Sequence, residues 1–286
     1  MSIKLTKPSC SVIIPAYNEE SCIRSTLLAL TEGMKPGEFE IIVVCNGCYD
    51  NTAAAARDAC EVARVIETSV ASKTNALNIG VKAATSQTVV FLDADIKTSA
   101  ASVRLLTRSL KATQRHLAYG KATFSTKNCS AAVQAFYRAW HLNPYFDGGK
   151  VGGFFAVSQK GLQELGTFPE LTNDDEYVRR ALMTKAVFVP AANYVVEPPR
   201  TLSSLIKVRS RVYRGNRELT SMNVPAASNQ QQANGYRFLV RLVRNPRVWA
   251  GAIVFAAVAI AAHLRNRSRT ETERWEQDTT ARAFEG

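Results

Sequence analysis

The most restrictive feature of this sequence is a repeated alternation of short apolar runs with longer helix-like stretches. The apolar runs are CSVIIPA at 10–16, EIIVVCN at 40–46, ARVIET at 63–68 and TVVFLDAD at 88–95. The stretches that follow them are 19–32, 51–61, 73–84 and 99–113. Apolar strands that alternate with helices are typical of a parallel sheet covered on both faces. We therefore predict an α/β domain with a mostly parallel central sheet.

The order is looser after Tyr119. A strand-like YGKATFST, a helix-like AAVQAFYRAWHL, a glycine-rich DGGKVGGFFAVS and a helix-like stretch over 174–184 follow one another. In open parallel sheets, ligands bind beyond the carboxyl ends of the strands. This rule predicts that residues 15–19, 45–50 and 93–95 form one ligand-binding cluster.

The charge is distributed unevenly along the chain. The 286 residues include 36 basic and 24 acidic side chains, a net charge of +12, and are 46% hydrophobic, which excludes a disordered chain. Residues 201–269 hold twelve Lys or Arg and one acid, Glu218. The rest is nearly neutral, so we predict a basic partner surface in the C-terminal third. The start resembles no secretory signal, and six irregularly spaced Cys form no recognisable disulfide framework, which favours the cytosol.

The C-terminal part contains a candidate membrane segment. A polar stretch at 222–234 is typical of a linker, and the charged tail at 265–286 is predicted to be exposed. Between them, the apolar run 248–264 has the minimum length for a membrane span. It is preceded by Arg241, Arg244 and Arg247 and followed by Arg265, Arg267 and Arg269. Basic residues on both flanks favour a helix lying in the cytoplasmic leaflet with Trp249 at the interface, and the alternative is a core helix.

Two polar motifs lie where apolar runs end. Asp93 and Asp95 offer the hard oxygen ligands that suit Mg²⁺ or Mn²⁺ on a diphosphate, although one Asp could instead cap a helix. In IIPAYNEE, Pro15 is predicted to end the strand ladder, and Tyr17, Asn18 and Glu19 suit a nucleobase and ribose. The alternative is a helix start with Asn18 as N-cap.

Six motifs in this order resemble those of a family 2 glycosyltransferase of the GT-A fold, over roughly residues 10–220. They are PAYNEE at 15–20, NGCYDNT at 46–52, SKTNALNIG at 72–80, DAD at 93–95, GGFFAVS at 152–158 and NDDEYVRR at 173–180. The resemblance implies a single Rossmann-like nucleotide-binding domain. It also implies a non-processive, bacterial type, because the Gln-x-x-Arg-Trp motif and the several membrane helices of processive synthases do not occur here.

The resemblance also implies a role for the second strand's end. Asn46, Gly47 and Cys48, with Asp50, stand where the family usually has Asp-Gly-Ser followed by Asp. Asn46 would then bind the base, Gly47 would let the backbone turn, and Asp50 would support the loop. Cys45 and Cys48 would be incidental, since a zinc site or a thioredoxin-like site lacks its other features here.

Lys73 is a candidate for binding a phosphate, and Asn78 is a candidate for fixing the loop beside it. The alternative for Lys73 is an exposed lysine in the first turn of a helix. Arg211, Arg214 or Arg217 could contact the diphosphate, or form a solvated helix face. The residues predicted to bind the nucleotide sugar are Pro15, Ala16, Tyr17, Glu19, Asn46, Asp50, Lys73, Asn78, Asp93, Ala94 and Arg214. Gly152 and Gly153 are predicted to bind the acceptor, and Asp93 and Asp95 the metal.

The resemblance places the catalytic base in an acidic pair at the start of a helix, which aligns with Asp174 and Asp175. In an inverting transfer, this carboxylate takes the proton of the attacking hydroxyl. We assign the base to Asp175 and orientation of the acceptor to Asp174, while Glu176 serves only the helix start. A plain helix N-terminus is the alternative.

Together these points predict an inverting, metal-dependent hexosyltransferase on the cytoplasmic side of the cell membrane. Its partners would be a nucleoside diphosphate sugar, a hydroxyl acceptor that could be lipid-linked, and the membrane surface, but no nucleic acid. The predicted layout is a GT-A domain over 1–220 with halves 1–118 and 119–220, a linker over 221–235 and a helical segment over 236–286. A sugar nucleotidyltransferase and a non-enzymatic basic protein that binds nucleic acid or membrane remain as alternatives.

Overall fold

The computed structural model describes residues 7–224 and 230–267. It divides into two compact units that interleave along the chain. The first contains the described residues up to Thr123, together with Val151–Glu170 and Ala181–Val196. The second contains Phe124–Lys150, Leu171–Arg180 and the described residues from Glu197 onward. Residues 268–286 of the predicted tail lie outside the described part of the chain.

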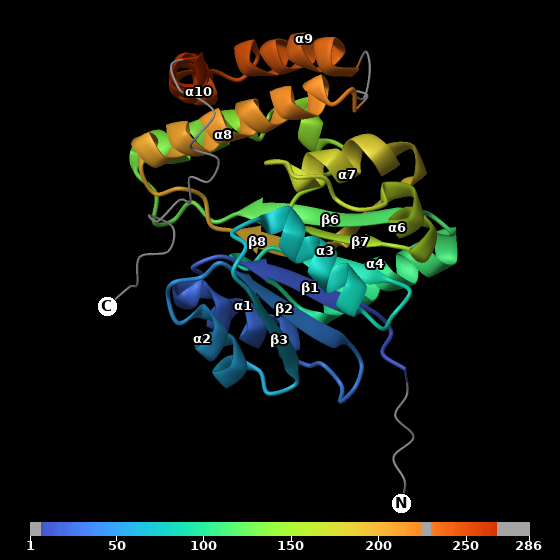
Figure 1. Cartoon of the computed structure of the whole chain (residues 1–286). Helices are drawn as coiled ribbons and strands as arrows, with labels where there is room; N and C mark the ends of the chain where they lie inside the picture. Colours follow the sequence, from blue (N-terminus) through green and yellow to red (C-terminus); the bar gives the residue numbers. More distant parts are fainter. Residues whose placement is uncertain (1–6, 225–229, 268–286) are drawn as a thin grey trace, which may run out of the picture. The chain divides into compact units, whose positions relative to one another are not determined.

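The first unit is built on one eight-stranded sheet with the order β3-β2-β1-β4-β7-β6-β8-β5. The strands are β1 Ser11–Ala16, β2 Glu40–Asn46, β3 Ala63–Thr68, β4 Val89–Leu92, β5 Ile96–Thr98, β6 Leu117–Phe124, β7 Phe154–Val157 and β8 Ala186–Val196. The first four in that order are parallel, as predicted, whereas β7 is antiparallel to both β4 and β6. The sheet is therefore mixed (Figure 1).

Helices cover both faces of the parallel strands. They are α1 Glu20–Thr31, α2 Thr52–Ala59, α3 Lys73–Ala83 and α4 Ala100–Thr113, with α6 Gln159–Leu165 further along the chain. Val12 and Ile14 share a buried cluster with α1 and α4. Ile13 faces the other way and meets α3 at Gly80, where a Cβ would lie 2.4 Å from Ile13. The period of two along β1 thus places one helix layer on each face.

The prediction that Pro15 ends the ladder is wrong. Strand β1 continues to Ala16, and Pro15 pairs with Val44 of β2. The pairing of β1 with β4 already ends at Ile13. Pro15 therefore lies where only one neighbouring strand remains, and its missing N–H is tolerated there.

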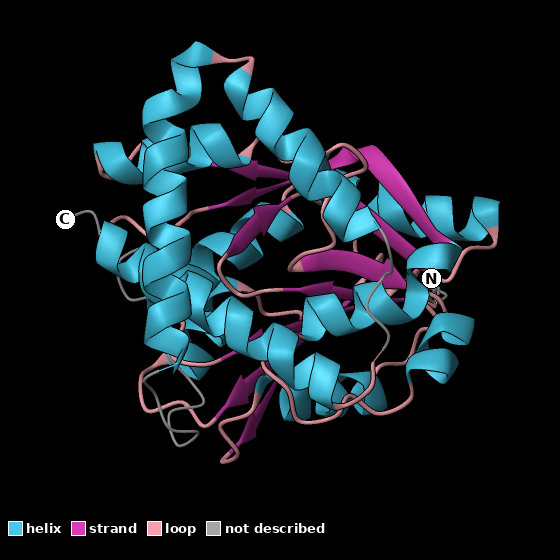
Figure 2. Ribbon diagram, turned by 90° about the horizontal axis from the view of Figure 1, so that it is seen from above, coloured by secondary structure: helices cyan, strands magenta, loops and turns pink. Residues whose placement is uncertain are grey.

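The second unit is helical. Its elements are α5 Ala131–Trp140, η1 Pro144–Phe146, the start of α7 Asp174–Leu182, α8 Leu202–Ser221, α9 Gln230–Val243, η3 Pro246–Val248 and α10 Trp249–Arg267. The end of α7 and the short helix η2 Met183–Lys185 that follows it belong to the first unit. Helix α10 packs against α5 and α8. Gly251 permits this approach, because a Cβ there would lie 2.2 Å from the Ala135 carbonyl oxygen. Figure 2 shows the chain from above, with all of its helices in cyan.

Helix α10 is longer than the predicted apolar run and is buried on one side only. Within the described residues, Pro246–Asn266 is the one helix long and apolar enough to cross a membrane, and 22% of its apolar 18-residue window is buried. Val258 and Ala262 are buried, whereas Ile253 and Ile260 are exposed. Helix α9 begins at Gln230, inside the stretch predicted to be a linker, and residues 225–229 are not described.

Candidate active site

In the first unit, Asp50 joins the loops that follow β1 and β2. One carboxylate oxygen accepts a hydrogen bond from the Thr52 backbone N–H at 3.0 Å, and the other accepts from the Glu20 backbone N–H at 3.2 Å. The Thr52 hydroxyl accepts from the Glu19 backbone N–H at 2.8 Å. Asp50 therefore supports this loop pair, which is the role that the resemblance implies.

Asn18 has a strained conformation and an unused hydrogen-bond donor. Its φ is 52°, and its side-chain oxygen accepts from the Tyr49 backbone N–H at 3.0 Å. The side-chain Nδ2 is buried and, among the described residues, has no hydrogen-bond partner. Glu19, rather than Asn18, is the N-cap of α1, so the interpretation of Asn18 as N-cap is wrong. Asn18 was predicted to suit a nucleobase or ribose, although the predicted nucleotide-sugar-binding residues do not include it. A buried amide donor without a partner among the described residues suits a ligand at this strand end.

Gly47 makes the turn after β2 possible. Its φ is +67°, and a Cβ would lie 2.8 Å from the Ala71 Cβ. Asn46, just before it, is almost fully buried and lies opposite Thr68 in the β2–β3 register. The turn therefore requires glycine for both conformation and space.

Cys48 is bound to the loop after β1. Its sulfur accepts from the Asn18 backbone N–H at 3.4 Å and donates to the Ala16 carbonyl oxygen at 3.3 Å. A hydrogen bond from Cys45 lowers the pKa of Cys48 to about 6, while that bond and burial raise the pKa of Cys45. No group of three or more His, Cys, Asp or Glu that could hold a metal occurs in the described part of the chain.

We expect the Cys45→Ser/Cys48→Ser double variant to keep most of its activity, because a serine hydroxyl replaces the hydrogen bonds of Cys48. Initial rates, with unfolding followed by circular dichroism, check this result. A large loss of rate in a protein that remains folded would instead give the thiols a functional role.

Lys73 and Asp93 form an ion pair at the carboxyl edge of the sheet. Lys73 is the first residue of α3, whose N-cap Ser72 accepts from the Asn75 backbone N–H at 3.3 Å. Its Nζ lies 2.7 Å from Asp93 Oδ1, and both side chains are partly exposed, at 20% and 32%. The structure thus brings together the predicted phosphate partner and a predicted metal ligand.

Gly153 borders the Asp93 carboxylate. The Asp93 backbone N–H donates to the Gly153 carbonyl oxygen at 2.8 Å, and a Cβ on Gly153 would lie 2.2 Å from Asp93 Oδ2. Gly152 is buried beside it, Ala94 is buried, and Asp95 is exposed. Any side chain at Gly153 would displace this carboxylate, so the glycine keeps the space around Asp93 open.

Asn78 is engaged with a loop. Its Nδ2 donates to the Phe168 carbonyl oxygen, and its Oδ1 accepts from the Phe168 backbone N–H, both at 2.9 Å. Phe168 also packs edge-on to Phe91 of β4. Asn78 therefore fixes the segment after α6 to α3, and its contact with a nucleotide sugar stays a prediction.

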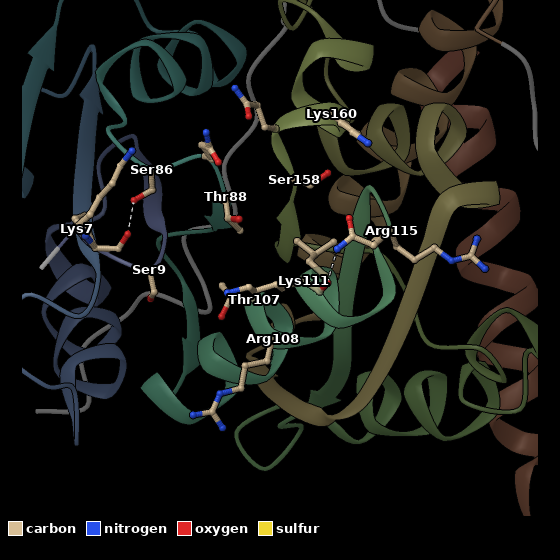
Figure 3. Close-up of a pocket in the computed structure, with 15 residues that line it drawn as sticks. Lys7, Ser9, Ser86, Thr88, Thr107, Arg108, Lys111, Arg115, Ser158 and Lys160 are labelled. Atoms are coloured by element: carbon tan, nitrogen blue, oxygen red, sulfur yellow. Dashed lines mark hydrogen bonds between the residues drawn. The ribbon is translucent and has the colours of Figure 1, made fainter.

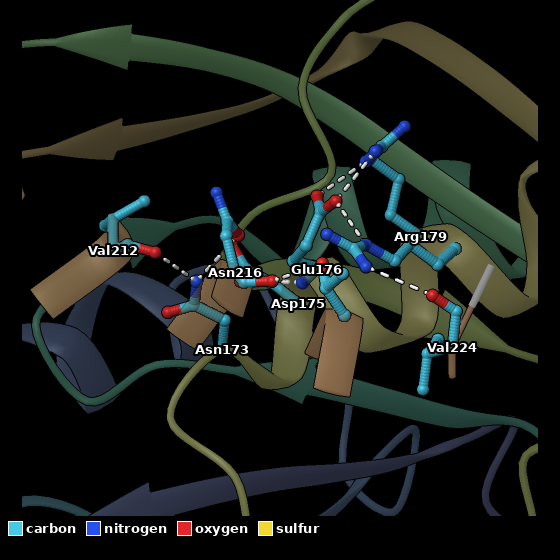
Figure 4. A network of polar contacts seen from close by, with 9 residues as sticks. Asn173, Asp175, Glu176, Arg179, Val212, Asn216 and Val224 are labelled. Atoms are coloured by element: carbon cyan, nitrogen blue, oxygen red, sulfur yellow. Dashed lines mark hydrogen bonds and ion pairs between the residues drawn. The ribbon is translucent and has the colours of Figure 1, made fainter. Parts of the chain in front are cut away.

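In the second unit, the acidic motif forms the start of α7. Asp174 is buried, and Asp175 Oδ1 accepts from the Glu176 backbone N–H at 2.8 Å. Just before them, the Asn173 side chain donates to the Val212 carbonyl oxygen and to Asn216 Oδ1 of α8, each at 3.0 Å (Figure 4). The position of the acidic pair is thus set by contacts with α8.

Glu176 has more than a helix-start role. It accepts two hydrogen bonds from Arg179, each 2.7 Å long, and one from Arg180 at 3.0 Å. Burial raises the pKa of Glu176, but these two guanidinium groups outweigh burial and lower the pKa below its ordinary value. The expectation that Glu176 serves only the helix N-terminus is therefore incomplete, because this ion-pair group also stabilises α7 internally.

The basic side chains of α8 differ in their surroundings. Arg209 lies over the rings of Trp140 and Tyr213, at 5.1 and 5.4 Å. Arg217 donates to Asn266 Oδ1 of α10 at 2.9 Å, and Arg214 is half-buried. Arg209 and Arg217 therefore hold the helices of this unit together and are not simply solvated.

Comparison with known proteins places this arrangement in a family. The family described as Glycosyl transferase family 2 matches residues 11–165, more than half of the chain. The chain belongs to glycosyl transferase family 2. As a family 2 member it is a glycosyltransferase that uses a nucleotide sugar.

Individual relatives agree with this placement. Glycosyltransferase AglE from Haloferax volcanii is 26% identical over 226 residues, which cover 73% of each chain. Mannosyltransferase PcManGT from Pyrobaculum calidifontis, solved with GDP-Man and Mn²⁺, superposes with a TM-score of 0.63 at 19% identity, covering 92% of this chain and 88% of its own. Glucosyl-3-phosphoglycerate synthase from Mycobacterium tuberculosis, solved with Mn²⁺, UDP and glucosyl-3-phosphoglycerate, gives 0.53 at 21% identity, covering 78% and 83%. The two structures show a shared GT-A fold.

The carboxylates of this family 2 chain fit a divalent cation that is also held by its substrate. Asp93 is partly exposed and already binds a cation, the Lys73 ammonium, at 2.7 Å. Two carboxylates alone are too few for an all-protein site, in agreement with the lack of any larger metal-binding group among the described residues. Mg²⁺ and similar cations are commonly held by one or two carboxylates together with substrate phosphates.

Proposed function

We propose that this protein is an inverting, non-processive transferase that moves one hexose from a nucleoside diphosphate sugar to a hydroxyl acceptor. The observation that carries the proposal is the Lys73–Asp93 ion pair at the carboxyl edge of a parallel sheet. In such sheets this edge is the usual ligand site. A cation and a carboxylate in contact there supply one group for a phosphate and one for a metal.

Asp93 and Asp95 would hold Mg²⁺ or Mn²⁺, which supplies positive charge against the departing diphosphate. The structural relative PcManGT was solved with Mn²⁺ and a nucleotide sugar, which supports this choice of cation. Lys73, whose ammonium lies 2.7 Å from Asp93 Oδ1, would bind a phosphate oxygen of the donor. The Asn18 amide N–H, which lacks a partner among the described residues, is available to the nucleoside.

Asp175 acts as the general base that takes the proton from the acceptor hydroxyl. It lies at the start of α7, whose position is held by the contacts of Asn173 with α8 and which the Glu176–Arg179 pair stabilises internally. A carboxylate on a fixed element keeps a defined orientation toward the proton that it accepts. Asp174, which is buried, positions the segment that receives the acceptor.

The C-terminal helices hold the enzyme on the cytoplasmic face of a membrane, near a lipid-linked acceptor. Helix α9 exposes Tyr236, Leu239 and Val243, and α10 exposes an apolar stripe that includes Ile253 and Ile260. Residues three, four or seven apart lie on one face of a helix. An apolar stripe with nearby arginines suits a helix in the membrane interface.

We expect the full chain to pellet with anionic vesicles at low salt and to be released partly at high salt. The Ile253→Glu/Ile260→Glu variant should stay in the supernatant, because both changes affect the exposed side of α10 and leave buried Val258 in place. Leu28→Glu/Val62→Glu makes the same chemical change at two exposed positions of the first unit and should pellet like wild type. Equal pelleting of all three proteins would contradict membrane binding through α10.

The donor is identified by incubating the protein and Mn²⁺ with UDP-, GDP- and dTDP-sugars and measuring free nucleoside diphosphate. We expect one donor to be hydrolysed slowly without acceptor, and the release to stop with EDTA. Absence of release from every donor, together with absence of binding, would contradict the proposed reaction.

A further inference from the structure

A cavity of about 630 Å³ lies in the first unit, away from the donor edge. It is lined by the segment before β1, the segment before β4, the C-terminal half of α4 and the start of α6. Ser9 and Thr88 lie just ahead of β1 and β4. Because these strands are parallel, the cavity lies at their amino ends. The candidate active-site residues follow the carboxyl ends, about 20 Å further along the six residues of β1.

The cavity is strongly basic. Among its fifteen lining residues are five cations and no carboxylate, and the cations are Lys7, Arg108, Lys111, Arg115 and Lys160. Apart from a hydrogen bond from Arg115 to the Thr184 carbonyl oxygen at 3.3 Å, no ion pair or side-chain hydrogen bond involves these cations in the described part of the chain. Their charge is therefore uncompensated.

Nearby carboxylates are already engaged. Glu164 binds Lys185 at 2.8 Å and His116 at 2.9 Å, and Glu38 binds Arg104 of α4. These pairs leave no acid to neutralise the cavity from the elements that form it. The distribution of charge along the sequence does not reveal this cluster, because all five cations come from the nearly neutral part outside residues 201–269. Folding gathers charges that are far apart in the chain.

We propose that this cavity binds a small anion that carries two or more phosphate groups. Its volume lies within the range of about 300–1,000 Å³ found for small-molecule sites. Figure 3 shows Lys7, Arg108 and Arg115 on different sides of the cavity, so a single phosphate cannot contact them all. A ligand with several phosphates can engage more than one of these cations, and lysine and arginine both bind phosphate oxygens.

The remaining lining suits a phosphate more than a membrane. Hydroxyl and amide groups complete the wall, and the Ser158 hydroxyl accepts from the Gly161 backbone N–H at 3.2 Å, which leaves its own proton for a ligand. The only aliphatic members of the lining are Pro8 and Leu110, and Leu110 is buried. A membrane-inserting surface would expose large apolar side chains instead.

The test is calorimetric titration of the full chain with inorganic tripolyphosphate in EDTA, which removes metal-dependent binding at the donor edge. We expect one bound anion per chain. Arg108→Ser/Lys111→Ser should weaken binding by about a hundredfold, since each of the two lost charge-assisted hydrogen bonds is worth about a factor of ten. Arg24→Ser/Lys82→Ser removes two exposed charges from α1 and α3 of the same unit and should bind like wild type.

Two further variants separate the sources of the anion. Lys73→Gln should retain full affinity, and a loss there would place the anion at the donor edge and overturn the proposal. Vesicles of phosphatidylcholine and phosphatidylglycerol test whether the cavity binds lipid headgroups. The protein used in this experiment carries Ile253→Glu/Ile260→Glu, so that α10 does not bind the vesicles. The protein could bind the vesicles but not tripolyphosphate, and lose this binding when Arg108 and Lys111 are replaced. That result would identify a headgroup phosphate as the ligand. If the binding of tripolyphosphate and the binding of vesicles are both unchanged in Arg108→Ser/Lys111→Ser, the cavity is not an anion site.

Discussion

Asp95→Asn should lose nearly all transfer, with kcat/KM falling by about a thousandfold or more. The change removes a proposed metal ligand and one negative charge, two residues after Asp93 of the Lys73–Asp93 pair. A metal ion contributes several kcal/mol of charge stabilisation in the transition state, and each 1.36 kcal/mol corresponds to about a factor of ten. Initial rates over a range of Mn²⁺ concentrations measure the effect. Partial rescue by high Mn²⁺ would agree with a weakened metal site.

The matched control is Asp58→Asn, the same chemical change at an exposed position of α2. It should have wild-type activity, because Asp58 is not part of the donor edge. Full activity of Asp95→Asn with Mn²⁺ present would disprove the metal assignment. Equal losses in both variants would point to a general effect of charge.

Asp175→Asn should bind donor and metal normally but turn over about 10²- to 10⁴-fold more slowly, which is the usual contribution of a general base. The amide cannot take the proton from the acceptor hydroxyl. It can still accept a hydrogen bond from the Glu176 backbone N–H, so the start of α7 should remain intact. Donor affinity from calorimetry and kcat from initial rates separate binding from chemistry.

Asp174→Asn is the comparison for this variant, because Asp174 is the adjacent, more buried member of the acidic pair. We expect it to change the KM for the acceptor more than kcat. If Asp174→Asn were inactive and Asp175→Asn active, the base would be Asp174. If both were fully active, the acidic pair would be only a helix start.

The parallel half of the sheet was predictable because its signal is local. The apolar stretches within 10–16, 40–46 and 88–95 are continuous, and they form β1, β2 and β4. Strand β8 was not predicted, since AVFVPAANYVV contains Pro190 and Asn193 and is only partly buried. Its pairing with β5 depends on residues about a hundred positions earlier. Short-range pattern carries no information about such a contact.

The residues of the candidate site likewise differ in whether a local sequence pattern or a long-range contact identifies them. Residue types at strand ends were sufficient to select Lys73 and Asp93, which the structure places in contact. Asn18 could be named from its position after the first strand as a residue that suits a nucleoside. That its Nδ2 is buried and has no partner among the described residues depends on the contact of two loops. The roles of Arg209 and Arg217 likewise depend on Trp140 and Asn266, which lie far away in the sequence.

The most direct test of the central claim is the fate of the donor during turnover. Proton and phosphorus NMR of a reaction with the α-linked sugar nucleotide identified in the donor panel would follow sugar and nucleotide together. We predict free nucleoside diphosphate and an initial product of β configuration, because attack comes from the face opposite the leaving group. A product that keeps the α configuration would contradict inversion, and release of sugar 1-phosphate would contradict glycosyl transfer itself.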